Sequence, residues 1–191
     1  MSTSRRNLWT RKILGCPINK VVCAQTSAFR GHILGVDPSL RGSGFSVIEV
    51  IGNHSIKLHE TLTLKLGPKY NSITCLGEIF KTTQRFLQSY PIKVVSIEQP
   101  IYVQNTRIAQ ILGSTRGACL AAVALAGIET KEYPPLRIKK SIVGIGRATK
   151  EQVSKMVSQL LHIDNLLPSD EADATAAALC HFFSLKSLLS P

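Results

Sequence analysis

Two short apolar runs in this chain each end on a single carboxylate. One run is GHILGV before Asp37, and the other is KVVSI before Glu98. Such runs predict strands that are buried on both faces, as in a parallel sheet covered by helices. A carboxylate at the end of a buried strand loses hydration unless a partner or a metal compensates for it. The chain is therefore constrained toward an α/β sheet with acids gathered at one edge.

Hydrophobic periodicity along the rest of the chain predicts the other elements. Segments 33–36, 45–51 and 56–66 predict an antiparallel meander of three strands, with a turn-rich loop at 37–44 and a hairpin turn at Gly52-Asn53. Later patterns predict helices over 72–90, 104–126, 150–161 and 169–188, and strands over 94–97 and 129–133, the last closed by Pro134-Pro135. This order predicts a ribonuclease-H-like α/β fold, a five-stranded mixed sheet flanked by helices.

The length of 191 residues predicts one domain, which we place at 33–188. Residues 1–32 differ in composition, with six Lys or Arg, several Ser and Thr, and no acid. They suit a transit peptide, a disordered basic arm, or a start codon placed too early. The five cysteines are scattered without a Cys-x-x-Cys motif, which indicates reduced thiols in a cytoplasmic protein. Organellar import of the N-terminus stays open, and no apolar stretch is expected to reach the ~18 residues of a membrane span.

Two further acids, Asp170 and Asp173, open the last predicted helix. Their i, i+3 spacing places them on one helical face, with Cβ atoms ~5–6 Å apart. Together with Asp37 and Glu98 they could hold two Mg²⁺ ions ~3.5–4 Å apart, with Mn²⁺ as a substitute, for in-line phosphodiester hydrolysis. Taken singly, Asp37 also suits a turn before proline, and the helix acids suit the positive end of the helix dipole.

The basic charge of the chain is concentrated beside these acids. Its 23 Lys and Arg face 12 Asp and Glu, giving a net charge of +11. Seven of the basic residues fall in the window 131–155, directly before the last acidic pair. Such a window suits contact with a nucleic-acid backbone, and equally a solvated lysine-rich loop.

Five segments in this order resemble the bacterial RuvC family of Holliday-junction resolvases. They are ILGVDPSLRGSGF at 33–45, SIEQ at 96–99, GSTRGA at 113–118, IVGIGRATK at 142–150 and DEADA at 170–174. The resemblance spans about 33–185. It implies that Asp37, Glu98, Asp170 and Asp173 are the catalytic, metal-binding carboxylates.

The resemblance also implies how DNA is held. Lys139 and Lys150 match basic positions that contact the junction backbone, and the same window offers Lys140 and Arg147. The family usually places an aromatic residue three positions after the catalytic Glu, where this chain has Ile101. The neighbouring Tyr102 is the candidate for stacking on an unpaired base.

The resemblance further implies a homodimer built on the helix at 104–126, whose two-fold axis presents two matching sites to a four-way junction. It also implies symmetric paired nicks in DNA recombination and repair, and RuvA and RuvB as partners. Two alternatives stand beside it: a non-catalytic junction-binding module, and a nucleotide-binding phosphotransferase of the actin type. His181 is expected to serve packing, and the roles of Arg107 and Arg116 stay undecided.

Overall fold

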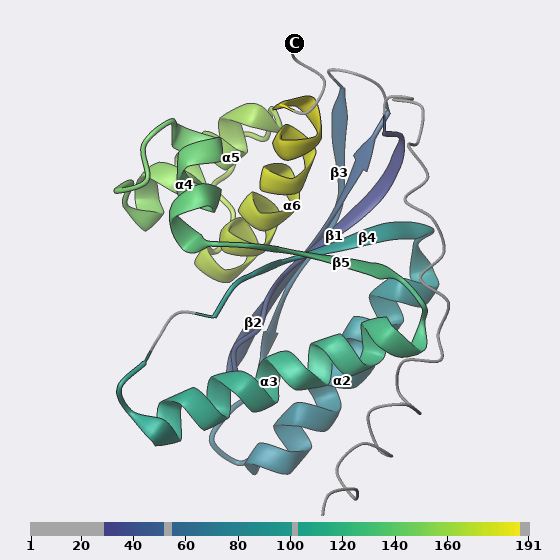
Figure 1. Ribbon diagram of the computed structural model, residues 1–191, viewed down its shortest axis with the longest axis vertical. Coiled ribbons are helices and arrows are strands. Elements are labelled where there is room, and N and C mark those ends of the chain that lie inside the picture. Colours follow the sequence, from purple (N-terminus) through teal and green to yellow (C-terminus); the bar gives the residue numbers. More distant parts are fainter. Residues whose placement is uncertain (1–28, 52–54, 101–102, 188–191) are drawn as a thin grey trace, which may run out of the picture.

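The computed structural model describes residues 29–51, 55–100 and 103–187. They contain five strands and five helices (Figure 1). Their order is β1 (Gly31–Asp37), β2 (Gly42–Val50), β3 (Ile56–Lys65), α2 (Ser72–Ser89), β4 (Ile92–Glu98), α3 (Thr106–Leu125), β5 (Glu129–Tyr133), α4 (Pro135–Val143), α5 (Lys150–Leu160) and α6 (Ser169–Ser187).

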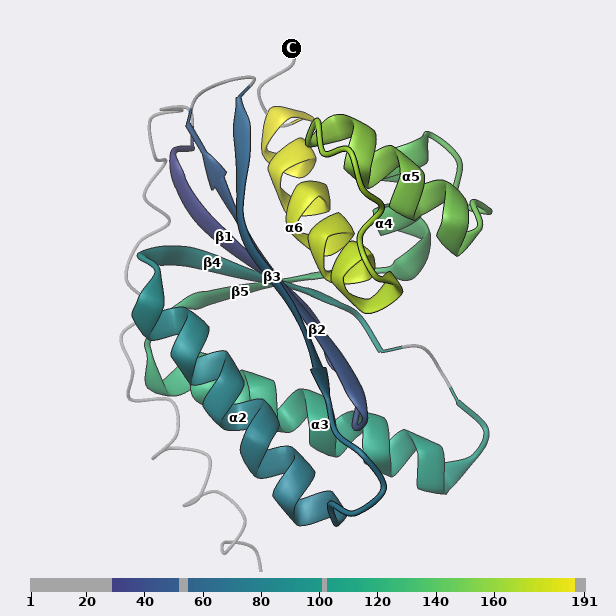
Figure 2. The same ribbon diagram turned by 180° about the vertical axis from the view of Figure 1, so that it is seen from behind.

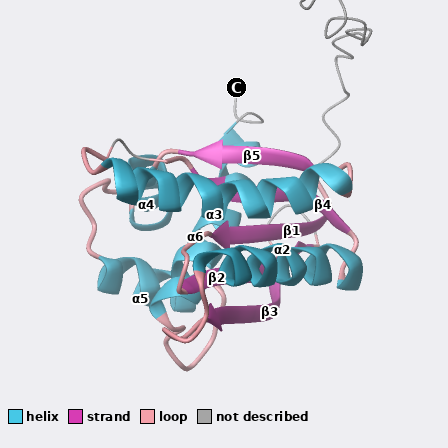
Figure 3. Cartoon of the chain, turned by 90° about the horizontal axis from the view of Figure 1, so that it is seen from below, coloured by secondary structure: helices cyan, strands magenta, loops and turns pink. Residues whose placement is uncertain are grey.

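The strands form one mixed sheet in the order β3-β2-β1-β4-β5, with β3 and β5 at the two edges (Figure 3). β1 pairs antiparallel with β2, and β2 with β3, whereas β1 with β4 and β4 with β5 are parallel. The predicted five-stranded ribonuclease-H-like sheet is thereby confirmed. Its parallel half brings the C-terminal ends of β1 and β4 side by side.

Helices cover both faces of the sheet (Figures 1 and 2). α2 and α3 lie on one face, and α4, α5 and α6 lie on the other. The central strand β1 contributes to both cores: Ile33 packs in the cluster under α4, α5 and α6, and Leu34 packs in the cluster under α2 and α3. This double burial explains why β1 is a continuous apolar run and not an alternating one.

Two glycines allow α6 to approach the sheet backbone. A Cβ added at Gly35 in β1 would lie 1.9 Å from the carbonyl oxygen of Ala174, and one at Gly44 in β2 would lie 1.9 Å from that of Asp170. Interpreting 37–44 as a turn-rich loop was therefore partly wrong, because β2 begins at Gly42. Glycine serves close packing at this point and not chain reversal.

Other differences from the sequence-based expectations concern prolines and element ends. Pro135 was assigned to the end of β5, but it is the first residue of the unpredicted helix α4, a position that proline favours. β1 begins at Gly31, two residues before the predicted start. The hairpin turn at Gly52-Asn53 lies outside the described residues, as do Ile101 and Tyr102 and most of the 1–32 extension.

Helix α3 is long and apolar enough to cross a membrane, by length and composition alone. The expectation that no stretch reaches that size is wrong for this helix. Much of its apolar surface is exposed, including Ile108, Leu112 and Leu125. Arg116 lies in the middle of the helix and forms an ion pair with Glu132 of β5, which ties α3 to the sheet.

Candidate active site

The fold places Asp37 and Glu98 at the same edge of the sheet. Asp37 is the last residue of β1, and Glu98 is the last residue of β4. The preceding residues, Val36 and Ile97, are partners in the parallel ladder. Asp37 and Glu98 are thus the next residues on neighbouring strands, which run ~4.8 Å apart.

Asp170 and Asp173 reach this edge from the start of α6. The side chain of Asp170 approaches β2, where a Cβ added at Gly42 would lie 3.0 Å from its Oδ2. Gly44, whose missing side chain admits the backbone of Asp170, is the ladder partner of Asp37. The two helix acids are therefore held over the ends of β1 and β2.

A set of side-chain hydrogen bonds fixes α6 along the sheet. Glu171 accepts hydrogen bonds from Thr61 and Thr63 of the edge strand β3. Farther along the helix, the Ser96 hydroxyl donates to the carbonyl oxygen of Ala177 at 2.6 Å. Sequence reasoning missed the role of Glu171. The one available signal in the sequence was that Glu171 is a third acid beside Asp170 and Asp173, the two proposed metal ligands.

Burial and neighbouring carboxylates raise the proton affinity of the two strand-end acids. The pKa of Asp37 is raised to about 7, first by burial and then by the charges of Asp173 and Glu98. Burial, followed by the charge of Asp173, also raises the pKa of Glu98. These interactions show that acids from β1, β4 and α6 lie within electrostatic reach of one another. An arrangement of this kind is favourable only when positive charge compensates for it.

Lys150 and Lys139 supply part of that positive charge. Nζ of Lys150, the first residue of α5, lies 2.7 Å from Oδ2 of Asp173, and this hydrogen bond is the main reason that the pKa of Lys150 is raised. A capping box between Thr149 and Gln152 fixes the start of α5. Lys139 of α4 lowers the pKa of Glu98 through its charge, which opposes the effect of burial.

The remaining basic candidates lie in the same region of the chain. Lys140 is in the last turn of α4, and Arg147 is an exposed residue in the connection from α4 to α5. Their contact with DNA stays a prediction, as does that of Tyr102. Arg107 is exposed at the start of α3.

Arg116 acts within the fold of the site, a role that sequence reasoning left undecided. Its guanidinium donates a hydrogen bond of 2.7 Å to the backbone carbonyl oxygen of Glu98 and pairs with the carboxylate of Glu132 at 2.6 Å. The side chain is mostly buried, at 13% exposure. Arg116 therefore joins the end of β4 to β5 and holds the backbone from which the Glu98 side chain projects.

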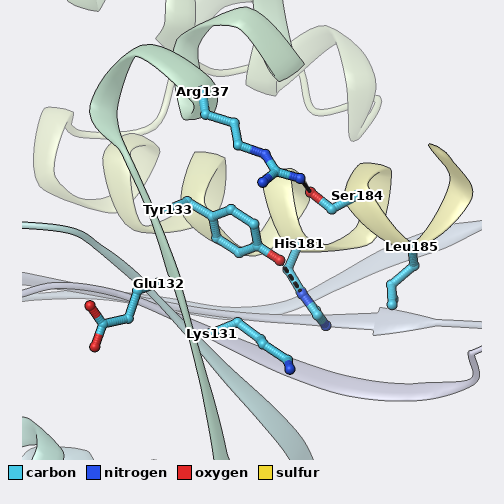
Figure 4. A pocket seen from close by; sticks show the side chains of 7 residues that line it. All are labelled: Lys131, Glu132, Tyr133, Arg137, His181, Ser184 and Leu185. Atoms are coloured by element: carbon cyan, nitrogen blue, oxygen red, sulfur yellow. Dashed lines mark hydrogen bonds between the residues drawn. The ribbon is translucent and has the colours of Figure 1, made fainter. Parts of the chain in front are cut away.

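His181 lies away from the carboxylates, in agreement with its predicted packing role. Figure 4 shows it on α6, where its Nδ1 is 2.7 Å from the hydroxyl of Tyr133. The two residues line a pocket of about 390 Å³ together with Arg137, whose guanidinium donates to the hydroxyl of Ser184 at 3.1 Å. Burial lowers the pKa of His181 to about 4, so its imidazole is neutral at pH 7.

The donor set at the sheet edge fits hard divalent cations. Its candidate ligands are all carboxylate oxygens, which Mg²⁺ and Mn²⁺ prefer over the nitrogen and sulfur ligands of softer metals. Fold and site together define a class: a ribonuclease-H-like protein with an acidic centre built from the ends of two parallel strands and the start of the last helix.

Comparison with known proteins agrees with this class. Residues 33–181 match the family model described as crossover junction endodeoxyribonuclease RuvC. The RuvC of Geobacter sulfurreducens is 33% identical over 160 residues, covering 83% of this chain and 97% of that protein. The RuvC of Burkholderia vietnamiensis is 36% identical over 157 residues, covering 82% and 86%. The chain belongs to the RuvC family of crossover junction endodeoxyribonucleases.

Solved structures give the same result. RuvC of Thermus thermophilus, in complex with a Holliday junction substrate, has a TM-score of 0.76 and 28% identity, covering 82% of this chain and 96% of that one. The yeast mitochondrial Holliday junction resolvase has a TM-score of 0.60 at 12% identity, covering 98% and 88%. The second likeness shows a shared fold. The family resemblance found in the sequence is thus confirmed.

Proposed function

We propose that this protein is a structure-specific endonuclease that resolves Holliday junctions by symmetric paired nicks during DNA recombination and repair. The observation that carries the proposal is the meeting of Asp37, Glu98, Asp170 and Asp173 at one edge of the sheet, in a member of the RuvC family. The alternatives, a non-catalytic junction-binding module and an actin-type phosphotransferase, gain no comparable support.

The four carboxylates are proposed to hold two Mg²⁺ ions, which Mn²⁺ can replace. When bound, such ions activate the attacking water and stabilise the leaving 3′ oxygen. The protein itself contributes by holding the four carboxylates in position. β1 and β4 fix Asp37 and Glu98 by ladder pairing, and the contacts of Glu171 and Gly44 fix the start of α6. Arg116 holds the end of β4 against β5.

The basic residues of α4, α5 and their connection are proposed to bind the phosphate backbone beside the carboxylates. Lys139 and Lys150 lie within electrostatic reach of the acids, which supports contact with the phosphates that flank the cleaved bond. The exposed Lys140 and Arg147 are proposed to extend the same basic surface, and Tyr102 is proposed to stack on an unpaired base.

A second copy of the chain is proposed to cover α3. Four small residues spaced four apart are exposed along this helix: Ala109, Gly113, Gly117 and Ala121. A Cβ at Gly113 or Gly117 would meet no atom within 4 Å, so a partner backbone has room to approach. Two-fold symmetry would supply two sites for two equivalent strands.

The remaining proposals concern the setting of the protein. RuvA and RuvB are proposed as partners in branch migration, because the chain belongs to the same family as the bacterial RuvC proteins. A cytoplasmic location is proposed because the cysteines are scattered, as is typical of reduced thiols. The alternative is import into an organelle, with the basic N-terminal extension as the targeting signal.

The direct test is cleavage of a synthetic mobile four-way junction beside a linear duplex of the same sequence, with and without Mg²⁺. Paired nicks at symmetric positions, on the junction only and with Mg²⁺ only, are the expected result. Tight junction binding without nicks would instead support the non-catalytic module. ATP turnover without junction binding would support the phosphotransferase.

The dimer has its own test. Leu112→Glu, beside the row of small residues on α3, should convert a dimer into a monomer in sedimentation-velocity runs. Ile73→Glu is the matched control, because Ile73 is 82% exposed on α2. An unchanged dimer in the Leu112→Glu variant would remove α3 from the interface.

A further inference from the structure

A second group of ligand-type side chains lies at the opposite end of the sheet from the carboxylates. It consists of His32 on β1, Glu49 on β2 and His59 on β3. One donor atom from each lies within 4.8 Å of the other two. His32 is the second residue of β1 and Asp37 is the last, so a rise of ~3.3 Å per residue puts roughly 16 Å between them.

Strand register brings the three residues together. His32 and Glu49 are direct partners in the β1–β2 ladder. Between β2 and β3 the register shifts, so that His59 is the extra residue between two regular pairs. A bulge of this kind re-aims a side chain. Here Nε2 of His59 lies 2.7 Å from Oε2 of Glu49.

Packing holds the two imidazole rings in place. Their centroids are 5.0 Å apart, and the ring of Tyr90 lies 6.1 Å from His32 and 5.9 Å from His59. The Tyr90 hydroxyl donates to Glu60 at 2.9 Å, which fixes that ring in turn. Restrained side chains of this kind lose little freedom when they bind an ion.

The surroundings of the group include one charge that opposes a cation, Lys57, which is the ladder partner of Glu49, and one feature that favours it. Tyr90 is the C-cap of α2, so the partly negative C-terminal end of that helix lies beside the rings, and its last turn carries no basic residue. The side chains of His59 and Glu49 are 23% and 32% exposed, which shields the group and leaves it open to a small ion.

We propose that His32, Glu49 and His59 form a binding site for a transition-metal dication of the Zn²⁺ type, with a fourth position open to solvent. Two imidazole nitrogens and one carboxylate oxygen are a donor set that Zn²⁺ accepts, whereas Mg²⁺ prefers oxygen ligands. A bound ion replaces the hydrogen bond between His59 and Glu49 and joins β1, β2 and the edge strand β3. Since it binds the folded chain, it raises the melting temperature.

The test uses the full-length protein, stripped of metal by a chelator and kept in excess Mg²⁺ to occupy the carboxylates. Co²⁺ is titrated as the spectroscopic probe, and Zn²⁺ is then added as competitor. One equivalent of Co²⁺ should give a visible absorption band that Zn²⁺ abolishes. His32→Gln and His59→Gln should each weaken binding by at least ~10-fold.

Two controls separate this site from other ligands. His162→Asn removes an exposed histidine elsewhere, and its positive φ of 53° suits asparagine, so the Co²⁺ affinity should be unchanged. Asp37→Asn, in the proposed nuclease centre, should also leave it unchanged. The melting temperature without metal reports whether each variant folds. A band that survives in the His32→Gln, His59→Gln double variant, or one abolished in Asp37→Asn, would overturn the proposal. Absence of any band in the folded wild-type protein would do the same.

Discussion

The ammonium nitrogen of Lys150 lies 2.7 Å from Oδ2 of Asp173. A proposed DNA-binding lysine is thus also the charge partner of a proposed metal ligand. The contact joins the start of α5 to the start of α6, and the Lys150 side chain is still 65% exposed. Lys150 can therefore interact with the acidic centre and with a phosphate that approaches it.

Removal of this charge should change the salt dependence of junction binding. Lys139→Ala and Lys150→Ala should each lower the slope of log K against log salt by roughly 0.9 for every phosphate that the lysine neutralises. Fluorescence anisotropy over a range of salt concentrations measures the slope. Lys81→Ala is the control, since Lys81 lies on α2, paired with Glu78. A slope unchanged in the Lys139 and Lys150 variants would remove both residues from the DNA surface.

Asp37→Asn should abolish cleavage and retain junction binding. The substitution keeps the size of the side chain and removes one charged ligand, so we expect a rate loss of at least ~10²-fold with little change in affinity. Single-turnover cleavage and gel-shift titration measure the two quantities. Asp164→Asn, at an exposed position, should change neither. Loss of binding together with cleavage would count against a metal role for Asp37.

Arg116→Lys should slow cleavage about 10-fold without weakening junction binding. Lysine keeps the charge but cannot bind both the Glu98 carbonyl oxygen and the Glu132 carboxylate with one planar group. The measurement is the single-turnover rate at saturating enzyme. Arg85→Lys, which alters an ion pair with Glu60, is the matched control. Equal rates for the two variants would mean that Arg116 does not position Glu98.

Gly44→Ala should reduce both stability and cleavage. The added carbon would meet the Asp170 carbonyl oxygen at 1.9 Å, so the helix must move, at about 1–3 kcal/mol of unfolding free energy. Gly77→Ala is the opposite case: its Cβ meets nothing within 4 Å, and it lies within α2. That variant should gain about 0.5–1 kcal/mol. Urea unfolding measures the unfolding free energy of both variants. A Gly44→Ala protein with the stability of the wild type would contradict the close packing.

The buried His181 should make the protein less stable in acid. Its pKa is about 4 in the folded state and about 6.5 when unfolded, so the unfolded state binds the extra proton. Stability is thus unaffected above about pH 6.5 and falls as the pH drops toward 4, by at most about 3 kcal/mol. His181→Asn keeps an acceptor for the Tyr133 hydroxyl and cannot titrate. Its unfolding free energy should depend less on pH across this window; an identical profile would contradict the assignment.

Much of this architecture can be predicted from local patterns. Glu98 was identifiable because a charge after Val-Val-Ser-Ile is unfavourable without a partner, and that reasoning needs no tertiary contact. The packing role of Gly44 could not be identified from the sequence, because a glycine that allows close approach of a helix backbone has the same sequence context as a glycine in a turn. Pro135 was ambiguous for a similar reason, because proline both ends strands and begins helices.

Other features depend on contacts across long sequence separations. Glu171 meets Thr61 and Thr63 over more than one hundred residues, and no periodicity links them. The placement of His59 beside Glu49 depends on a register shift between β2 and β3, which the alternation of Ile56–Lys65 does not reveal. Local patterns predict which strand or helix carries each charged residue, whereas tertiary packing determines which of these residues contact one another.

The closeness of α6 to Gly35 and Gly44 has a consequence for how this protein tolerates change. Neither position bears a functional group, yet one added methyl at either would meet a backbone oxygen at 1.9 Å. In a saturation scan scored by junction cleavage, these two positions should be as intolerant as the carboxylates themselves. Positions sensitive to mutation would then include those that set the distance between α6 and the sheet, in addition to the carboxylates that carry the chemistry.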